Sequence, residues 1–209
     1  MKIAICLPIY HGAAPRFVPS IVELVAFTLT ARVEGPDGAI RPDLKPFMVS
    51  SANIAHSRRL LAEGALEWGA EWLFWVDADQ TFPPDALLRL IAHGQGMIGA
   101  NIRRRDASVV EATAVTLRDG EAVRLLPDGD GIEEVLEIGF GLCLTHAELS
   151  RKMDRPYFAD EIGEDGIGFT SEDTNFCRKA RAAGFPIFVD HGLSKEVGHM
   201  AAIELRFPP

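Results

Sequence analysis

The sequence has little of several features that mark particular classes of protein. Only three of its 209 residues are cysteine, and Cys6, Cys143 and Cys177 lie far apart among apolar neighbours. This spacing disfavours a disulfide framework or a cysteine-rich zinc site and favours reduced thiols in a core. No stretch approaches the roughly 20 apolar residues of a membrane span, and Pro8 interrupts the first apolar run. We therefore expect a cytoplasmic protein without a transmembrane segment.

Positive charge is scarce as well. Lysine and arginine together number 21 against 30 acidic residues, which gives a net charge of −9. A broad nucleic-acid-binding surface is therefore not expected, and any anionic ligand must meet a local basic cluster. The run Arg103, Arg104 and Arg105 is such a cluster, although an exposed basic turn is an equally good interpretation of it.

No linker-like segment and no internal repeat divides the chain, so we expect one domain over residues 1–209. Apolar runs at 2–8, 46–50, 71–77 and 96–101 predict strands, and helical patterns lie between them. Such alternation, with strands buried on both faces, predicts an α/β fold with a doubly wound, mostly parallel central sheet. The shorter runs in 107–145 predict a small antiparallel excursion, and the glycine-rich, acidic segment 160–173 predicts a loop.

Helix boundaries can be read from capping residues. The pattern from Asn53 to Trp68 ends at Gly69, which suits the position after a helix. A later helix is expected from Glu172 to Ala183, followed by Gly184. The helix dipole should favour the charged form of the acidic side chains in its first turn.

Asp77 and Asp79 follow an apolar strand, at the edge of the sheet where doubly wound folds bind ligands. In an extended chain they would point the same way, with Cα atoms about 6–7 Å apart. Carboxylates in such a place can hold Mg²⁺ or Mn²⁺ together with substrate phosphates. An isolated D-x-D is weak evidence, but its position at the end of a buried strand favours a metal site over a solvated turn.

Taken together, several segments resemble the GT-A-fold glycosyltransferases, in particular the inverting, family-two-like enzymes that use nucleotide sugars. The resemblance covers nearly the whole chain and rests on the order and spacing of the segments; residues 30–50 and 103–132 match only loosely. It implies a nucleotide-sugar-binding half over 1–101 and an acceptor-binding half over 102–209. The segments are CLPIY, NIAHSRRLLAEGAL followed by WLFWVDADQTFPPDAL, IGFGLCL, and SEDTNFCRKARAAGFPIFVD followed by VGHM.

The resemblance implies a role for residues on the donor side. Pro8 and Tyr10 would line the nucleotide pocket, and Asn53 and Arg58 would lie beside the base or ribose. Asp77 would lie near the ribose or a metal-bound water. The donor would be a UDP- or GDP-sugar.

The metal ligands and the catalytic acids follow from the same resemblance. Asp79 and His199 would bind Mn²⁺ or Mg²⁺, and Asp173 would remove the proton from the acceptor hydroxyl while Glu172 contacts the acceptor. Gly141 could let the backbone approach the sugar closely, although a β-bulge would need the same residue. The implied activity is that of a metal-dependent hexosyltransferase, inverting, with an acceptor that the sequence does not identify.

Three alternatives compete with this interpretation. Asp77 and Asp79 also fit the D-x-D-x-T nucleophile loop of haloacid-dehalogenase-type phosphatases, in which the first aspartate attacks phosphorus. That loop usually follows the first core strand, which is not its place here. A nucleotidyltransferase should have a glycine-rich phosphate loop with a basic residue, and LPIYHGAAP is not one. A non-catalytic nucleotide-sugar-binding domain would keep the fold without the activity.

Overall fold

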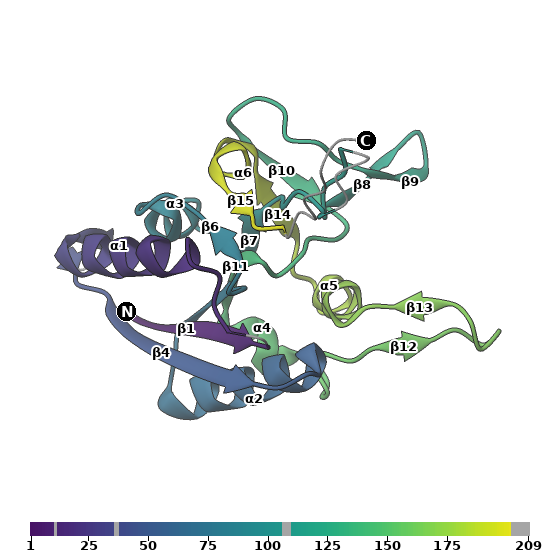
Figure 1. Cartoon of the computed structure of the whole chain (residues 1–209), viewed down its shortest axis with the longest axis horizontal. Coiled ribbons are helices and arrows are strands. Elements are labelled where there is room, and N and C mark those ends of the chain that lie inside the picture. Colours follow the sequence, from purple (N-terminus) through teal and green to yellow (C-terminus); the bar gives the residue numbers. More distant parts are fainter. Residues whose placement is uncertain (11, 36–37, 106–109, 202–209) are drawn as a thin grey trace, which may run out of the picture.

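The fold is taken from a computed structural model, which describes residues 1–10, 12–35, 38–105 and 110–201. Helices and strands alternate along most of the chain (Figure 1). The helices are α1 (Phe17–Thr30), α2 (Ile54–Trp68), α3 (Ala86–Ala92), α4 (Ala147–Lys152), α5 (Glu172–Ala182) and α6 (His191–Glu196). The strands are β1 (Lys2–Ile9), β2 (Val33–Gly35), β3 (Gly38–Ile40), β4 (Asp43–Ser50), β5 (Trp72–Val76), β6 (Gln80–Thr81), β7 (Met97–Ala100), β8 (Val115–Arg118), β9 (Glu121–Arg124), β10 (Ile132–Val135), β11 (Leu142–His146), β12 (Glu161–Ile162), β13 (Phe169–Thr170), β14 (Ile187–Asp190) and β15 (Gly198–His199).

The central sheet has seven strands in the order β10-β14-β7-β11-β5-β1-β4. Strands β4, β1 and β5 pair in parallel, and β7 and β14 pair in parallel with each other. Strand β11 lies antiparallel between β5 and β7, and β10 pairs antiparallel with β14 at one edge. The mostly parallel α/β sheet is thus confirmed. The antiparallel excursion includes two strands of the main sheet as well as the separate β8-β9 hairpin.

Helices cover both faces of the sheet, because alternate residues of each buried strand enter two different cores. Ile3 and Phe74 pack with α1 and α3, whereas Ala4, Leu73 and Trp75 pack with α2, α4 and α5. Figure 1 shows α1 and α3 on one side of β1 and β4 and α2 on the other. The doubly wound arrangement follows from this two-sided burial.

The expected helix ends are confirmed. Asn53 is the N-cap of α2 and its side chain accepts a hydrogen bond from the backbone N–H of His56 at 2.8 Å. Gly69 ends the same helix with φ 80°, a left-handed conformation that glycine adopts without steric cost. Gly184 follows α5 with φ 84°.

Three local expectations are wrong. Segment 160–173, expected to be a loop, contains the β12-β13 hairpin, which projects from the body beside α5 (Figure 1). A short helix, α6, follows the last strand of the sheet and was not anticipated. Strand β4, expected to be buried on both faces, lies at the sheet edge with many exposed side chains.

The three cysteines are free and buried, as expected of core thiols. Among the described residues, no helix is both long and apolar enough to cross a bilayer.

Candidate active site

The chain turns immediately after strand β5, which separates the two aspartates. The strand ends at Val76, and the backbone N–H of Asp77 donates to the carbonyl of Gly141 at 3.0 Å. The carbonyl of Asp77 then accepts from the N–H of Gln80 at 3.2 Å, as in a tight turn. The expectation of an extended chain with both carboxylates pointing the same way is therefore wrong, and each carboxylate has its own partners.

Asp77 belongs to a buried network with Arg58 and Glu172. The Arg58 guanidinium, on α2, donates to Asp77 Oδ1 at 3.1 Å and to Glu172 Oε1 at 2.5 Å. Its side chain is only 4% exposed, and it lies over the rings of Phe140 and Phe158. The resemblance placed Arg58 beside the base or ribose, but the structure commits its terminal nitrogens to two carboxylates. Arg58 thus links the D-x-D segment to the start of α5.

The two acids at the start of α5 have different surroundings. Burial raises the pKa of the Glu172 carboxyl, although the charge of Arg58 acts in the opposite direction. Desolvation is the larger effect on the pKa of Glu172, and it opposes the contribution expected from the helix dipole. Asp173 is partly exposed, and its Oδ1 accepts hydrogen bonds from the Thr174 N–H, at 2.8 Å, and from the Ser171 hydroxyl.

A cavity of about 230 Å³ brings both acids to the D-x-D segment. The residues lining it come from the strand ends and from α2 and α5. Its lining includes Ile54, Arg58, Asp77, Gln80, Thr113, Phe140, Gly141, Glu172, Asp173 and His199. Six of the sequence-predicted residues therefore share one cavity, which we call the Asp173 cavity.

Asp79 and His199 are 120 positions apart in sequence and meet in the structure. Strand β15 pairs antiparallel with β6, so that His199 lies opposite Gln80. The N–H of Met200 donates to the carbonyl of Asp79 at 2.9 Å. His199 Nε2 is then 3.5 Å from Asp79 Oδ2. The sequence could not show that these residues meet.

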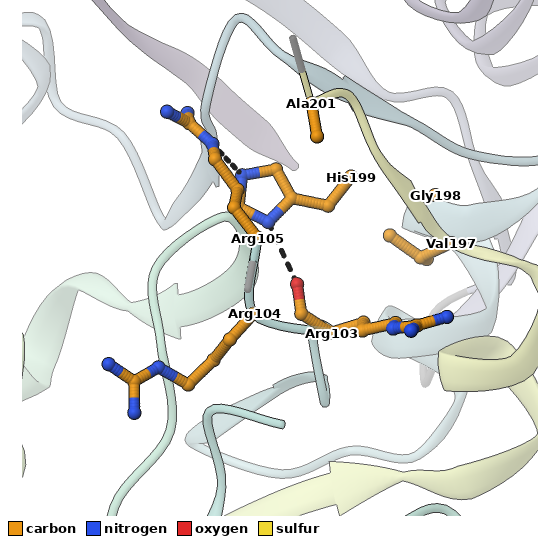
Figure 2. A pocket seen from close by; sticks show the side chains of 7 residues that line it. All are labelled: Arg103, Arg104, Arg105, Val197, Gly198, His199 and Ala201. Carbon is orange, nitrogen blue, oxygen red and sulfur yellow. Dashed lines mark hydrogen bonds between the residues drawn. The ribbon is translucent and has the colours of Figure 1, made fainter. Parts of the chain in front are cut away.

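The tautomer of His199 is fixed by its second nitrogen. His199 Nδ1 lies 2.8 Å from the carbonyl oxygen of Arg103 (Figure 2). A carbonyl can only accept, so Nδ1 carries the hydrogen and Nε2 has a lone pair that can accept a hydrogen bond or bind a metal. Burial lowers the pKa of His199, which favours the neutral ring, while this hydrogen bond acts in the opposite direction. A neutral imidazole oriented by a backbone carbonyl is typical of a metal ligand.

Arg105 lies between these two side chains and was not anticipated there. Its Nε donates to His199 Nε2 at 2.9 Å, as Figure 2 shows. Its Nη2 donates to Asp79 Oδ2. All three arginines of the basic run line a pocket of about 380 Å³ together with Val197, Gly198, His199 and Ala201. Arg105 is exposed, as the interpretation of an exposed basic turn requires, and it also contacts Asp79 and His199.

A divalent cation fits the Asp79 and His199 donor set. A carboxylate oxygen and an imidazole lone pair lie close together, and a positively charged group already bridges them. Within the described residues, no group of three or more His, Cys, Asp or Glu side chains could hold a metal. A cation here would need further oxygen ligands, and Mg²⁺ and Mn²⁺ commonly take them from substrate phosphates and water.

A second cavity, of about 300 Å³, opens beside the same residues, and we call it the Tyr10 cavity. Its lining includes Pro8, Tyr10, Ile54, Asp77, Asp79 and Arg105. Pro8 and Tyr10 thus lie where a nucleotide pocket was expected. Asn53 differs, because its side-chain oxygen is used to cap α2. Its neighbour Ile54 lines both cavities, and no motif in the sequence marked it.

Gly141 lies in a position that is too close for a side chain. A Cβ at this position would lie 3.2 Å from Ile102 Cγ1 and 3.3 Å from the Gln80 side chain. The Gly141 carbonyl also holds the N–H of Asp77. A larger residue here would therefore require the Ile102 and Gln80 side chains to shift by a few tenths of an ångström.

Comparison with known proteins gives structural neighbours only. No family model and no curated protein matches the sequence. The crystal structure of A197 from STIV superposes with a TM-score of 0.56 at 14% identity, covering 100% of this chain and 99% of that one. The structure of GalNAc-T7 with UDP, GalNAc and Mn²⁺ gives a TM-score of 0.61 at 11% identity. This match covers 97% of this chain and 44% of the GalNAc-T7 chain.

The chain has the GT-A glycosyltransferase fold. At these identities the likeness shows the fold alone. The Asp77 carboxylate, which would be the nucleophile of a haloacid-dehalogenase-type phosphatase, is held by Arg58.

Proposed function

We propose that this protein is a metal-dependent glycosyltransferase that moves a hexose from a UDP- or GDP-sugar to an acceptor hydroxyl. The observation that carries this proposal is the meeting of Asp79 with His199 beside the Tyr10 cavity, in a GT-A fold. That the similar GalNAc-T7 structure contains UDP, GalNAc and Mn²⁺ supports a nucleotide-sugar donor and a divalent cation.

On the donor side, Asp79 and the Nε2 atom of His199 would hold Mn²⁺ or Mg²⁺. When bound, the cation neutralises charge that develops on the diphosphate leaving group. Pro8 and Tyr10 would line the nucleotide pocket, within the half of the chain formed by residues 1–101. Asp77, fixed by Arg58, would face the ribose from the floor of the same cavity.

On the acceptor side, Asp173 would be the general base. A base must reach the acceptor hydroxyl in its ionised form, and Asp173 faces the cavity that also contains Asp77 and His199. Hydrogen bonds from Thr174 and Ser171 orient its carboxylate. Glu172 is held by Arg58, so we infer that it positions the start of α5 and touches the acceptor only at the cavity wall. Attack from this side would invert the anomeric centre.

The substitution Asp173→Asn tests the base. It keeps the shape of the side chain but cannot accept the proton, so the transfer rate should fall by about 10²- to 10⁴-fold. Donor affinity should stay within about threefold, because the donor would bind in the Tyr10 cavity and Asp173 lines the Asp173 cavity. Release of nucleoside diphosphate from the donor and a donor titration measure the two effects.

The control is Glu161→Gln, which removes one exposed acid from the base of the β12-β13 hairpin and should leave both quantities unchanged. Normal transfer by Asp173→Asn would show that another group is the base. Release of inorganic phosphate from sugar phosphates, abolished by Asp77→Asn, would instead favour the phosphatase.

A further inference from the structure

Arg105 occupies the position between the two proposed cation ligands. Its guanidinium donates to His199 Nε2 at 2.9 Å (Figure 2). It also donates to Asp79 Oδ2, so one positive group engages both side chains. The His199 lone pair that a metal would use is the acceptor of the Arg105 hydrogen bond. Asp79 Oδ2 is likewise engaged. A divalent cation and the Arg105 guanidinium therefore cannot both use these atoms.

The Arg105 side chain is free to leave this position. It is 59% exposed, so water can solvate the guanidinium when its contacts break. Exposed ion pairs contribute little to stability, because water screens them and both side chains lose freedom. Arg105 therefore neutralises the charge of Asp79, and another cation can replace it with little loss of stability.

The displaced guanidinium has a destination nearby. Arg105 lines the Tyr10 cavity as well as the arginine pocket of Figure 2, so the same side chain faces the space in which the donor would bind. A guanidinium forms paired, charge-assisted hydrogen bonds with phosphate oxygens. In the Tyr10 cavity, the anion available to the displaced guanidinium would be the donor diphosphate beside Asp79.

We propose that Arg105 is a resident counter-cation of the Asp79 and His199 pair, which the divalent cation displaces and which then binds the donor diphosphate. The proposal rests on the proposed function both for the cation and for the diphosphate. It makes cation and nucleotide binding mutually favourable, because the cation frees Arg105 to bind the diphosphate and the diphosphate draws Arg105 away from the cation ligands.

The first test measures Mn²⁺ alone, by electron paramagnetic resonance of the free ion. Arg105→Ala should bind Mn²⁺ about fivefold more tightly than the wild type. In the wild type the cation must first displace the exposed Arg105 ion pair, and the variant lacks that competitor. The matched control is Arg104→Ala, since Arg104 pairs instead with Glu111 at 2.9 Å. The control should keep the wild-type affinity, and Arg105→Ala combined with Asp79→Asn should lose Mn²⁺ binding.

The second test measures UDP and GDP at saturating Mn²⁺. Arg105→Ala should bind the nucleotide that the wild type prefers at least about tenfold more weakly, because a charge-assisted hydrogen bond to phosphate is lost. Arg105→Lys should recover part of this affinity. The signature is thus opposite in sign for the two ligands, tighter for the cation and weaker for the nucleotide.

An unchanged or weaker Mn²⁺ affinity in Arg105→Ala would overturn the counter-cation role. Unchanged nucleotide affinity would overturn the diphosphate step. If the wild type binds neither UDP nor GDP while Arg105→Ala still gains Mn²⁺ affinity, the counter-cation role is supported and the donor assignment under Proposed function fails.

Discussion

Two arginines hold acidic residues at the same edge of the sheet, and they differ in burial. Arg58 links Asp77 to Glu172 with a side chain that is 4% exposed. Arg105 links Asp79 to His199 with a side chain that is 59% exposed. One D-x-D segment is thus joined to a buried cation by its first acid and to an exposed cation by its second.

The difference indicates different tasks for the two acids. Removing one partner of a buried ion pair leaves an uncompensated charge, which costs far more than loss of an exposed pair. Arg58 therefore fixes the geometry of Asp77 and of the start of α5. The contacts of Arg105 can exchange for those of another cation, which is what a ligand site requires of Asp79.

The largest expected effect is on stability when the buried cation is removed. Arg58→Met keeps most of the apolar contact with Phe140 and Phe158 but leaves Asp77 and Glu172 without their partner. The free energy of unfolding in urea should fall by about 3 kcal/mol. A loss below about 1 kcal/mol would show that the two arginines do not differ in the way described.

The two aspartates should differ in the same sense. Asp77→Asn removes the charge that pairs with buried Arg58, and the free energy of unfolding should fall by about 1.5 kcal/mol. Asp79→Asn breaks an exposed pair and should cost less than about 1 kcal/mol. Equal losses in urea denaturation would contradict the assignment of structural and ligand-binding roles.

A smaller effect is expected for the exposed cation. Arg105→Met makes the same chemical change as Arg58→Met and is its matched control. Its free energy of unfolding should stay within about 0.5 kcal/mol of the wild type, since surface substitutions seldom cost more. A loss comparable to that of Arg58→Met would mean that Arg105 is a structural element and not an exchangeable one.

The smallest effect concerns pH. Burial sets the pKa of His199 below the ordinary 6.5, so as pH falls the unfolded chain binds this proton before the folded protein does. Stability present above pH 6.5 is therefore lost as pH drops through the folded-state pKa. Between about pH 7.5 and about pH 5.5 the wild type should lose roughly 0.5 kcal/mol more than His199→Asn. An equal loss in both proteins would contradict the buried, neutral ring.

Local signals predicted much of the fold. The start of α2 at Asn53 and the helix ends at Gly69 and Gly184 depend on backbone geometry set by neighbouring residues, so the sequence was sufficient to predict them. The antiparallel insertion of β11 depends on a pairing partner, β5, that is distant in the chain. Periodicity carries no information about such partners.

The candidate site divides in the same way. Of the residues expected near the donor and acceptor, all except Asn53 line one of two cavities. The pairing of Asp77 and Asp79 with two different arginines was not predictable, because it depends on the residue at which β5 ends. Nor was Arg105, since its contact needs both the β15-β6 pairing and the carbonyl of Arg103.

The central claim is that Asp79 and His199 form a cation-dependent nucleotide-sugar site. Thermal unfolding of the wild type and of Asp79→Asn, against UDP-, GDP-, CDP- and dTDP-sugars with and without Mn²⁺, tests it directly. We predict that one UDP- or GDP-sugar, at about a hundred times its dissociation constant, raises the wild-type melting temperature by roughly 5–10 °C with Mn²⁺ and much less without it. Asp79→Asn should lose this shift. No shift with any nucleotide sugar, or an equal shift in Asp79→Asn, would contradict the claim.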